Sequence, residues 1–342
     1  CRQRMGIISG GIKMDVSNEI AARAKIINKH IESYLSDVDN KKLGEAMRHY
    51  PSAGGKRMRP ILAQVVAEAV GKAGDKAIPF GCGIELIHNF TLVHDDVMDN
   101  DMVRRGIPAV HALFDVPTAI IAGDALFARA FEVIANTDVD PSKCPTLLKL
   151  AARSVYLVAE GQQDDMDFEN IPAEELKEED YLKMVWKKTA VLFECAAEGG
   201  AIIGQGSQEQ IEKMREYAHM LGIGFQIWDD VLALTGNEKS LGKPVGNDIR
   251  NGKRTIIALH ALHTLDADDP RKKTLLAALG NADATEEQIK AAIDAIQDSI
   301  EYAKDASAQC AKKAKESLSC INDGPEKEFL IGLVDFAVGR SV

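Results

Sequence analysis

The sequence predicts an all-helical protein, and three observations lead to that prediction. From about Glu19 to Val342 the apolar residues recur at the spacing of helix faces, in segments rich in Ala, Leu, Glu and Lys. No run between turn signals alternates between apolar and polar residues as a half-buried strand would. Hydrophobic residues make up 46% of the chain, which is ample for a sizeable buried core.

Turn signals divide the chain into helices. The pattern is interrupted at Gly54-Gly55, at the Gly-Ile-Pro turn within 105–108, in the polar segment 165–175 and in the glycine-rich loop 236–252. The helices expected between these and shorter breaks span, in chain order, 18–36, 41–49, 57–72, 76–99, 117–137, 144–164, 178–203, 208–233, 253–264, 271–279, 285–304, 306–321 and 326–338.

The chain is expected to form a single helical domain over residues 17–342, because no linker of low complexity divides it. Residues 1–16 are interpreted as a flexible lead, or one left from cloning, since they hold no apolar stretch long enough for a signal peptide. No apolar run reaches the length of about 18 residues that a membrane span requires. Six widely separated cysteines without a C-x-x-C spacing favour a reducing cytoplasm over a disulfide framework or a zinc site.

The net charge of −11 argues against a nucleic-acid partner, which would favour a basic face. Positive charge nevertheless gathers locally in a chain that is otherwise acidic. Three clusters stand out, formed by Lys56, Arg57 and Arg59, by Arg104 and Arg105, and by Lys187 and Lys188. Such clusters suggest small anionic ligands.

The segment HDDVMDND, His94 to Asp101, ends a long apolar helix. Asp95 and Asp99 are four residues apart and share a helix face, with Asp96 beside them. Their mutual repulsion calls for compensation, and Mg²⁺ binds one or two carboxylates together with phosphate oxygens. A solvated acidic helix end is the alternative.

Two further acidic clusters follow apolar helical stretches. Asp229-Asp230, in GFQIWDDVLALTG, could face the first cluster across a cavity of the bundle. Asp164, Asp165 and Asp167 form either a solvated patch at a helix end or a wall of the same cavity.

Basic motifs give these carboxylates counter-charges. GGKRMRP sets Lys56 and Arg59 three residues apart at a helix start, after two glycines that let the backbone approach an anion. Arg104 and Arg105 could bind a second phosphate or simply neutralise the aspartates. Two diphosphates of about three negative charges each need about three divalent metals and several Lys or Arg side chains in the same cavity. The sequence supplies both the carboxylates and the cations for that arrangement.

From about residue 20 to the C-terminus the chain resembles the trans-isoprenyl diphosphate synthases, particularly the archaeal geranylgeranyl diphosphate synthases. The motifs that carry the resemblance are GGKRMRP at 54–60, IHNFTLVHDDVMDND at 87–101, RRG at 104–106, GQQDD at 161–165, KKTA at 187–190, GFQIWDD at 224–230 and LGKPVGNDIRNGKRT at 241–255. The family implies a helical bundle around a deep apolar cavity, a homodimer, and diphosphates bound at the mouth of that cavity.

The resemblance also implies a role for each matched residue. The main ligands of about three Mg²⁺ ions would be Asp95, Asp99 and Asp229, with Asp96 and Asp230 close by. The isopentenyl diphosphate would be held by Lys56, Arg59, His88 and Arg105. The allylic diphosphate (dimethylallyl, geranyl or farnesyl) would be held by Arg104, Lys188, Lys243 and Lys253. The space beside the allylic carbons would be lined by Thr189, Gln226 and Gln162, with Asp165 near them.

The implied reaction is ionisation, condensation and elimination. Mg²⁺ and the cationic side chains would stabilise the departing diphosphate, so that an allylic carbocation forms and is attacked by the double bond of isopentenyl diphosphate. Loss of a proton, to the released diphosphate, would complete a five-carbon extension. Water must be excluded because it would trap the cation.

The chain departs from the family pattern in two places. The second acidic motif often reads DDxxD, whereas Ala233 stands at its last position here, so Asp229, diphosphate oxygens and water would complete that metal shell. The end of the chain, FAVGRSV, lacks the strongly basic tail of many members and leaves the role of Arg340 open.

Product length can be argued from the residues that precede Asp95 on its helix. Phe90 lies five residues before Asp95 and Thr91 four before, so one bulky ring beside a small neighbour would floor the cavity. This pattern resembles a C20 (geranylgeranyl) synthase more than a C15 (farnesyl) synthase. Ordinary core packing of Phe90 is the alternative.

Three rival functions remain in view. Glu85-x-x-His88 and Glu216-x-x-His219 have the spacing of di-iron helical bundles, although chance accounts for two such pairs. A regulatory subunit should have lost carboxylates or substrate lysines, and here only position 233 is altered. A terpene cyclase would not need an isopentenyl site at Lys56 and Arg59.

Overall fold

The computed structural model describes residues 14–236 and 245–339, and within them it confirms the all-helical prediction. The α-helices are α1 (Val16–Tyr34), α2 (Lys41–Ser52), α3 (Met58–Gly71), α4 (Gly74–Met98), α5 (Val110–Leu113), α6 (Val116–Ala135), α7 (Cys144–Phe168), α8 (Glu178–Val185), α9 (Val191–Ile203), α10 (Gln208–Thr235), α12 (Asn247–Arg250), α13 (Ile256–Thr264), α14 (Pro270–Ala278), α15 (Glu286–Ala295), α16 (Gln297–Ser317) and α17 (Pro325–Val338). A π-helical turn, η1 (Trp186–Ala190), and a 3-10 turn, η2 (Leu318–Cys320), complete the helical elements of this part of the chain.

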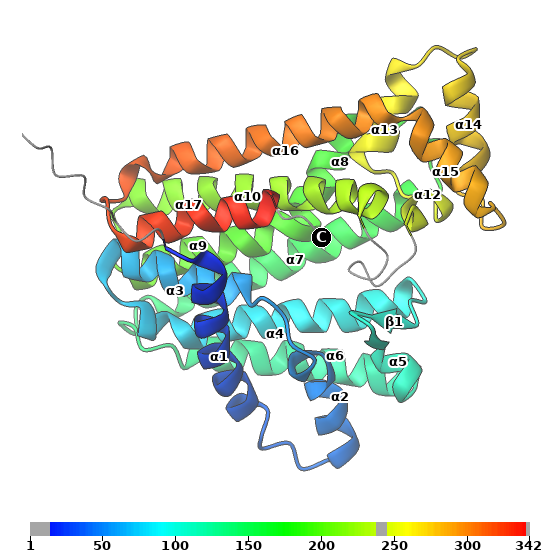
Figure 1. The fold of residues 1–342 in the computed structure, drawn as a ribbon. Helices are drawn as coiled ribbons and strands as arrows, with labels where there is room; N and C mark the ends of the chain where they lie inside the picture. The colour runs from blue at the N-terminus through cyan, green and yellow to red at the C-terminus, as the bar shows by residue number, and fades with distance from the viewer. Residues whose placement is uncertain (1–13, 237–244, 340–342) are drawn as a thin grey trace, which may run out of the picture.

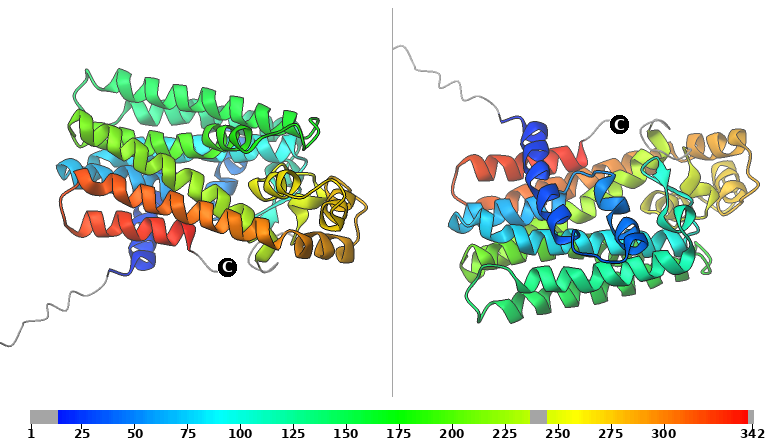
Figure 2. Two further views of the ribbon diagram at one scale, coloured as in Figure 1. Left: turned by 90° about the horizontal axis from the view of Figure 1, so that it is seen from above. Right: turned by 90° about the horizontal axis from the view of Figure 1, so that it is seen from below.

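The long helices lie side by side as a bundle (Figure 1). Contacts run from α6 to α4, α3, α9, α10 and α16 in turn, and α7 packs on α9 and η1. Helix α1 crosses the outside of the bundle against α3, α4 and α17, as the right-hand view of Figure 2 shows. None of the helices described combines the length and the apolar character needed to cross a membrane.

Two apolar clusters form the interior. The larger one joins α1 to α4, α6, α7, α9 and α17 with the first half of α10. The smaller one lies around α8, α13, α14, α15 and α16, and the second half of α10 contributes to it. Helix α10 therefore runs through both clusters, and its acidic end is positioned by the smaller one.

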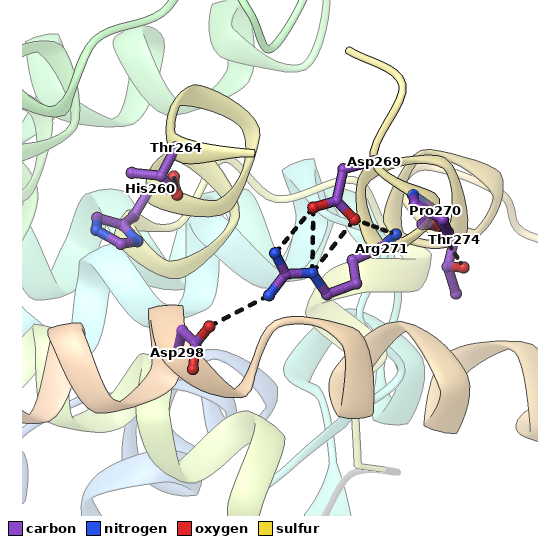
Figure 3. Close-up of polar contacts among 7 residues, drawn as sticks. All are labelled: His260, Thr264, Asp269, Pro270, Arg271, Thr274 and Asp298. Atoms are coloured by element: carbon purple, nitrogen blue, oxygen red, sulfur yellow. Dashed lines mark hydrogen bonds and ion pairs between the residues drawn. The ribbon is translucent and has the colours of Figure 1, made fainter. Parts of the chain in front are cut away.

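The smaller cluster is fastened at its surface by polar contacts between α14 and α16 (Figure 3). Asp269 caps the start of α14 by accepting a hydrogen bond from the Arg271 N–H at 2.8 Å. The Arg271 guanidinium lies between Asp269 at 2.8 Å and Asp298 of α16 at 3.2 Å. The rings of His260 on α13 and Tyr302 on α16 stack with centroids 3.9 Å apart. These contacts tie α13 and α14 to α16, helices that the sequence pattern treats as separate.

Several element boundaries differ from the predicted ones, and three of them bear on the site or on the smaller cluster. The helix predicted from 253 begins at Ile256, because Thr255 caps it with a side chain that accepts a hydrogen bond from the Ala258 N–H. The helices predicted over 285–304 and 306–321 break near Ile296 instead. The turn predicted at 105–108 belongs to a hairpin of two short strands, β1 (Val103–Arg104) and β2 (Ile107–Pro108). The hairpin follows α4 and carries Arg104 and Arg105 to the site described next.

Candidate active site

A cavity of about 1130 Å³ opens among α4, α7, α10, η1 and α12. The predicted residues that line it are Lys56, Arg59, His88, Thr91, Asp95, Asp99, Arg104, Arg105, Asp165, Lys188, Thr189, Gln226, Asp229, Asp230 and Lys253. Asp96, Gln162 and Phe90 do not line it. Lys243 lies outside the described residues. The two acidic motifs and the basic motifs, which are far apart in the sequence, thus share one space.

The carboxylates at the end of α4 divide into two kinds. Asp95 faces the cavity, and burial raises the pKa of its carboxyl to about 6, opposed by the charge of Lys188 and supported by that of Asp99. Asp99, the residue that follows α4, is exposed at the cavity wall. Asp96 is fully buried and accepts hydrogen bonds from Arg104 Nε at 2.7 Å and from the Tyr50 hydroxyl. Asp96 therefore fixes the hairpin arginine, whereas Asp95 and Asp99 are available to a ligand.

The two carboxylates near the end of α10 both line the cavity, but they differ in burial. Asp230 is 7% exposed and accepts hydrogen bonds from the Tyr181 hydroxyl at 2.6 Å and from Gln226 Nε2 at 3.1 Å. Burial raises the pKa of the Asp230 carboxyl to about 7, although the Tyr181 hydrogen bond lowers it. The first aspartate of the pair is thus the more exposed one.

The structure adds Asp248 to this group. The N–H of Gly246, the cap of α12, donates to the carbonyl of Ala233 at 3.0 Å. Asp248 follows two residues later and lines the same cavity, and its charge raises the pKa values of Asp230 and Lys253. A carboxylate from the glycine-rich loop is therefore brought beside the helix turn where the third motif position holds alanine.

The third acidic cluster is likewise split. Asp165 lines the cavity and accepts a hydrogen bond from Lys188 Nζ at 2.6 Å, with Lys253 Nζ at 3.6 Å. Asp164 instead pairs with Lys187 Nζ at 2.8 Å, outside the cavity lining. The two alternatives, a cavity wall and a patch outside it, therefore apply to different residues of the cluster. Asp165 forms part of the cavity wall, and Asp164 does not.

The basic wall is formed by α3, α4 and the hairpin. The Arg59 guanidinium lies over the Phe193 ring, 4.4 Å from its centroid, and its buried Nε has no hydrogen-bond partner in the described residues. Burial lowers the pKa of Arg59 to about 10, with Glu85 opposing, so the group stays charged at neutral pH. Burial and the neighbouring arginines hold the pKa of His88 well below its usual range, so its ring is neutral. An anion would satisfy the orphaned N–H of Arg59.

Arg57 has a structural role that the sequence did not separate from those of Lys56 and Arg59. Its backbone is left-handed (φ 50°), and its side chain is 2% exposed. The guanidinium donates to Glu85 at 3.0 Å, to Asn28 at 2.7 Å and to the carbonyls of Gly54 and Pro51. This buried arginine fastens the turn before α3 to α4. No sequence signal marks it, because three cations in four residues look alike.

The cavity also has apolar lining residues. Its wall includes, among others, Leu92, Val158, Met184, Val185, Leu192, Phe193 and Phe225. The Phe193 and Phe225 rings lie 5.7 Å apart. The sequence pattern places these residues on helix faces without showing that they share a cavity, and they give it water-excluding surface beside the charged groups.

The residue proposed as the cavity floor lies elsewhere. The Phe90 ring packs edge-on against Phe127 of α6, with centroids 5.4 Å apart, and against His94. Thr91 does line the cavity. The structure therefore places the small member of the pair at the wall and the bulky member in the seam between α4 and α6.

Gln162 is 6% exposed, and neither atom of its side-chain amide has a hydrogen-bond partner in the described part of the chain. The structure gives no account of this residue.

The di-iron alternative also loses its ligands, because Glu85 is bound to Arg57, Glu216 to Lys213 and His219 to Glu194.

Known proteins match the chain over most of its length. The family model described as "Polyprenyl synthetase" matches residues 40–296. A short chain isoprenyl diphosphate synthase of Methanocaldococcus jannaschii is 46% identical, over 81% of this chain and 83% of that protein. A geranylgeranyl diphosphate synthase of Methanosarcina mazei is 37% identical, over 96% and 98%. The crystal structure of geranylgeranyl pyrophosphate synthetase from Pyrococcus horikoshii superposes with a TM-score of 0.90 at 40% identity, covering 96% of this chain and 99% of that one. The chain, with its two acidic motifs on one cavity, belongs to the polyprenyl synthetase family, the trans-isoprenyl diphosphate synthases.

Proposed function

We propose that this protein is a geranylgeranyl diphosphate synthase, which extends allylic diphosphates with isopentenyl diphosphate by a metal-assisted ionisation. The observation that carries the proposal is the shared cavity, whose lining combines acidic, basic and apolar side chains. A diphosphate fits the charged groups, and a prenyl chain fits the apolar ones. Relatives named geranylgeranyl diphosphate synthase support the C20 product, and the C15 farnesyl product is the nearest alternative.

The carboxylates fit Mg²⁺ in the presence of substrate. Within 14–236 and 245–339, no three His, Cys, Asp or Glu side chains converge to hold a metal by themselves. Mg²⁺ commonly takes one or two carboxylates plus phosphate oxygens, so Asp95, Asp99 and Asp229 would bind about three ions only together with diphosphate. Bound there, the metal would supply positive charge to the departing diphosphate. Asp248 would take the part of the carboxylate missing at position 233.

The isopentenyl diphosphate site is assigned to Lys56, Arg59, Arg105 and neutral His88. Arg59 offers an N–H that is buried and unpartnered, and Arg105 donates to the Gly54 carbonyl at 3.0 Å at the same turn. The Arg57–Glu85 pair holds this turn in place. The cations would therefore be pre-arranged around the anion before it binds.

The allylic diphosphate is assigned to Arg104, Lys188 and Lys253, together with Lys243 on the sequence motif alone. Lys188 and Lys253 already converge on Asp165, which holds both ammonium groups at the cavity. Thr189 donates to the Gln226 amide oxygen at 3.1 Å, so these two dipoles lie where a cation would develop. The apolar wall keeps water away from that cation.

Product length is assigned to the α4 wall of the cavity, where Thr91 leaves room. Phe90 and Phe127 pack together in the seam between α4 and α6, outside the cavity lining, and would affect chain length by supporting that wall. The proposal includes a homodimer and a cytoplasmic location, as the family and the cysteine pattern suggest.

The test is an extension assay. The purified protein is incubated with labelled isopentenyl diphosphate, each allylic primer and Mg²⁺, and the extracted lipids are sized. We expect mainly C20 product, none with a chelator, and none from the double variant Lys56→Ala and Arg59→Ala. Lys187→Ala is a matched control for Lys188→Ala, because Lys187 pairs with Glu160 and Asp164 outside the cavity. Elongation that survives loss of both Lys56 and Arg59, or product that forms without metal, would refute the assignment.

A further inference from the structure

The wide turn η1 interrupts what the sequence pattern presents as one helix over 178–203. The Val191 N–H donates to the Trp186 carbonyl five residues back, rather than four as in an α-helix. Lys188 and Thr189 both lie inside this turn. A π turn is rare and seldom stable by itself, so the structure around it must hold it open.

A polar bridge spans the turn on the side away from the cavity. Trp186 Nε1 donates to Glu194 Oε1 at 2.8 Å, from the start of the turn to the first turn of α9. His219 Nδ1 of α10 donates to the same oxygen at 2.7 Å. The Glu194 side chain is 13% exposed, and none of the three residues lines the cavity. Hydrogen bonds to an ionised acceptor are roughly twice as strong as neutral ones.

Two glycines press neighbouring helices against the same turn. A Cβ at Gly161 of α7 would lie 2.5 Å from the backbone nitrogen of Lys188, and one at Gly222 of α10 would lie 2.6 Å from the Ala190 Cα. Helices α7 and α10 therefore pack closely against the turn. The Glu194 bridge adds a contact of its own, at Trp186, the first residue of the turn.

We propose that Glu194 is a positioning residue, and that its bridge to Trp186 and His219 keeps the wide turn open so that Lys188 and Thr189 reach the cavity. Return to a regular helix would rotate the residues beyond the altered turn by about 100°. Lys188 would then leave Asp165, and Thr189 would leave Gln226, their partners at 2.6 and 3.1 Å. The inference rests on the proposed function, because it assigns these two residues to the allylic substrate.

The kinetic test compares Glu194→Leu, which removes the acceptor, with Glu194→Gln, which keeps an acceptor for the indole N–H. In Glu194→Leu we expect kcat/KM for geranyl diphosphate to fall on the order of 10- to 100-fold, the size of loss that small misplacements cause. The KM for isopentenyl diphosphate should stay within about twofold, because its side chains lie on other elements. Glu194→Gln should recover most of the activity. The proposal would be overturned if Glu194→Leu left kcat/KM for geranyl diphosphate unchanged. It would also be overturned if the KM for isopentenyl diphosphate rose by as large a factor as kcat/KM for geranyl diphosphate fell.

A spectroscopic readout follows the turn itself. The sequence contains two tryptophans, so 5-fluorotryptophan labelling gives two fluorine resonances, which a Trp228→Phe variant assigns. The Trp186 resonance should shift in Glu194→Leu and stay near its wild-type position in Glu194→Gln. An unmoved resonance would show that the bridge does not hold Trp186.

The two proposals fail separately. A wild-type protein that makes no prenyl diphosphate would end the proposed function. The role of Glu194 would then be decided by calorimetric binding of inorganic diphosphate with Mg²⁺, which should weaken on the order of tenfold in Glu194→Leu if Lys188 is displaced. Equal binding by the two proteins would overturn it.

Discussion

Glu85 has a single described ion-pair partner, Arg57, and both side chains are almost wholly buried. Glu85→Ala is expected to lower the free energy of unfolding by about 3–5 kcal/mol, because it leaves a buried guanidinium without its counter-charge. Urea denaturation measures this change. Glu132→Ala is the matched control, since Glu132 is 62% exposed in its pair with Arg129 and should change stability by less than about 0.5 kcal/mol. Similar effects of the two substitutions would contradict the tethering role of Arg57.

The buried Asp230 makes the metal-free protein sensitive to pH. Its pKa is about 7 in the folded state against an ordinary value of 3.8, so the folded state holds a proton that the unfolded state has lost between those values. The contribution of Asp230 to stability is therefore full below about pH 4 and is lost as the pH rises through about 7. With a chelator present, Tm should fall over this window, and Asp230→Asn should fall less. Parallel pH profiles for the two proteins would rule out Asp230 as the source.

At the residue scale, the sequence predicted which motifs meet but not how neighbouring residues divide. Helical spacing predicted Asp95 and Asp99 on one face, and both line the cavity. The same spacing placed Asp96 beside them, whereas in the structure Asp96 is buried and accepts a hydrogen bond from Arg104. Arg57 differs from Lys56 and Arg59 only through its left-handed backbone and its partners on other elements. Such partners are tertiary facts, and a linear pattern does not contain them.

At the element scale, apolar periodicity predicted the existence of most helices and missed their irregularities. One extra residue in a turn shifts the helix face without changing composition, so 178–203 read as continuous although η1 divides it. The break near Ile296 was missed for a related reason, because no glycine or proline marks it. The short hairpin at 103–108 read as a turn, since each strand has two residues.

The crossing of α3 and α9 positions two residues of the site, Arg59 and Phe193. A Cβ at Gly200 would lie 2.4 Å from the Ala63 carbonyl oxygen, a backbone atom with little freedom to move. Gly200→Ala is therefore expected to destabilise the protein by about 1–3 kcal/mol through overpacking, measured by urea denaturation. Gly324→Ala makes the same chemical change where the new methyl group meets only the flexible Glu326 side chain at 3.3 Å. Comparable stabilities of the two variants would show that the crossing tolerates a wider separation.

At the scale of the whole molecule, α6 leaves an apolar face exposed. Val116, Ile120 and Phe127 share one side of it by helical spacing, with Ile121 adjacent, and these side chains are between 39% and 55% exposed. Exposed apolar residues gathered on one helix face indicate an interface, whereas single ones are ordinary. Phe127 also contacts Phe90, so a partner on this face would cover the seam assigned to product length.

We therefore expect a homodimer through α6, with twice the monomer mass by light scattering after size exclusion. Ile120→Asp combined with Ile121→Asp should shift the protein toward monomer, because each carboxylate would lose its hydration in a packed apolar interface. Ile26→Asp is the control, since Ile26 is 47% exposed on α1 and lies outside the α6 face. A dimer that survives the double substitution would place the interface elsewhere. Product length of these monomers is a second readout. Longer prenyl chains than the dimer makes would show that the partner subunit helps close the α4–α6 seam. Unchanged chain length would show that Phe90 and Phe127 close the seam without the partner.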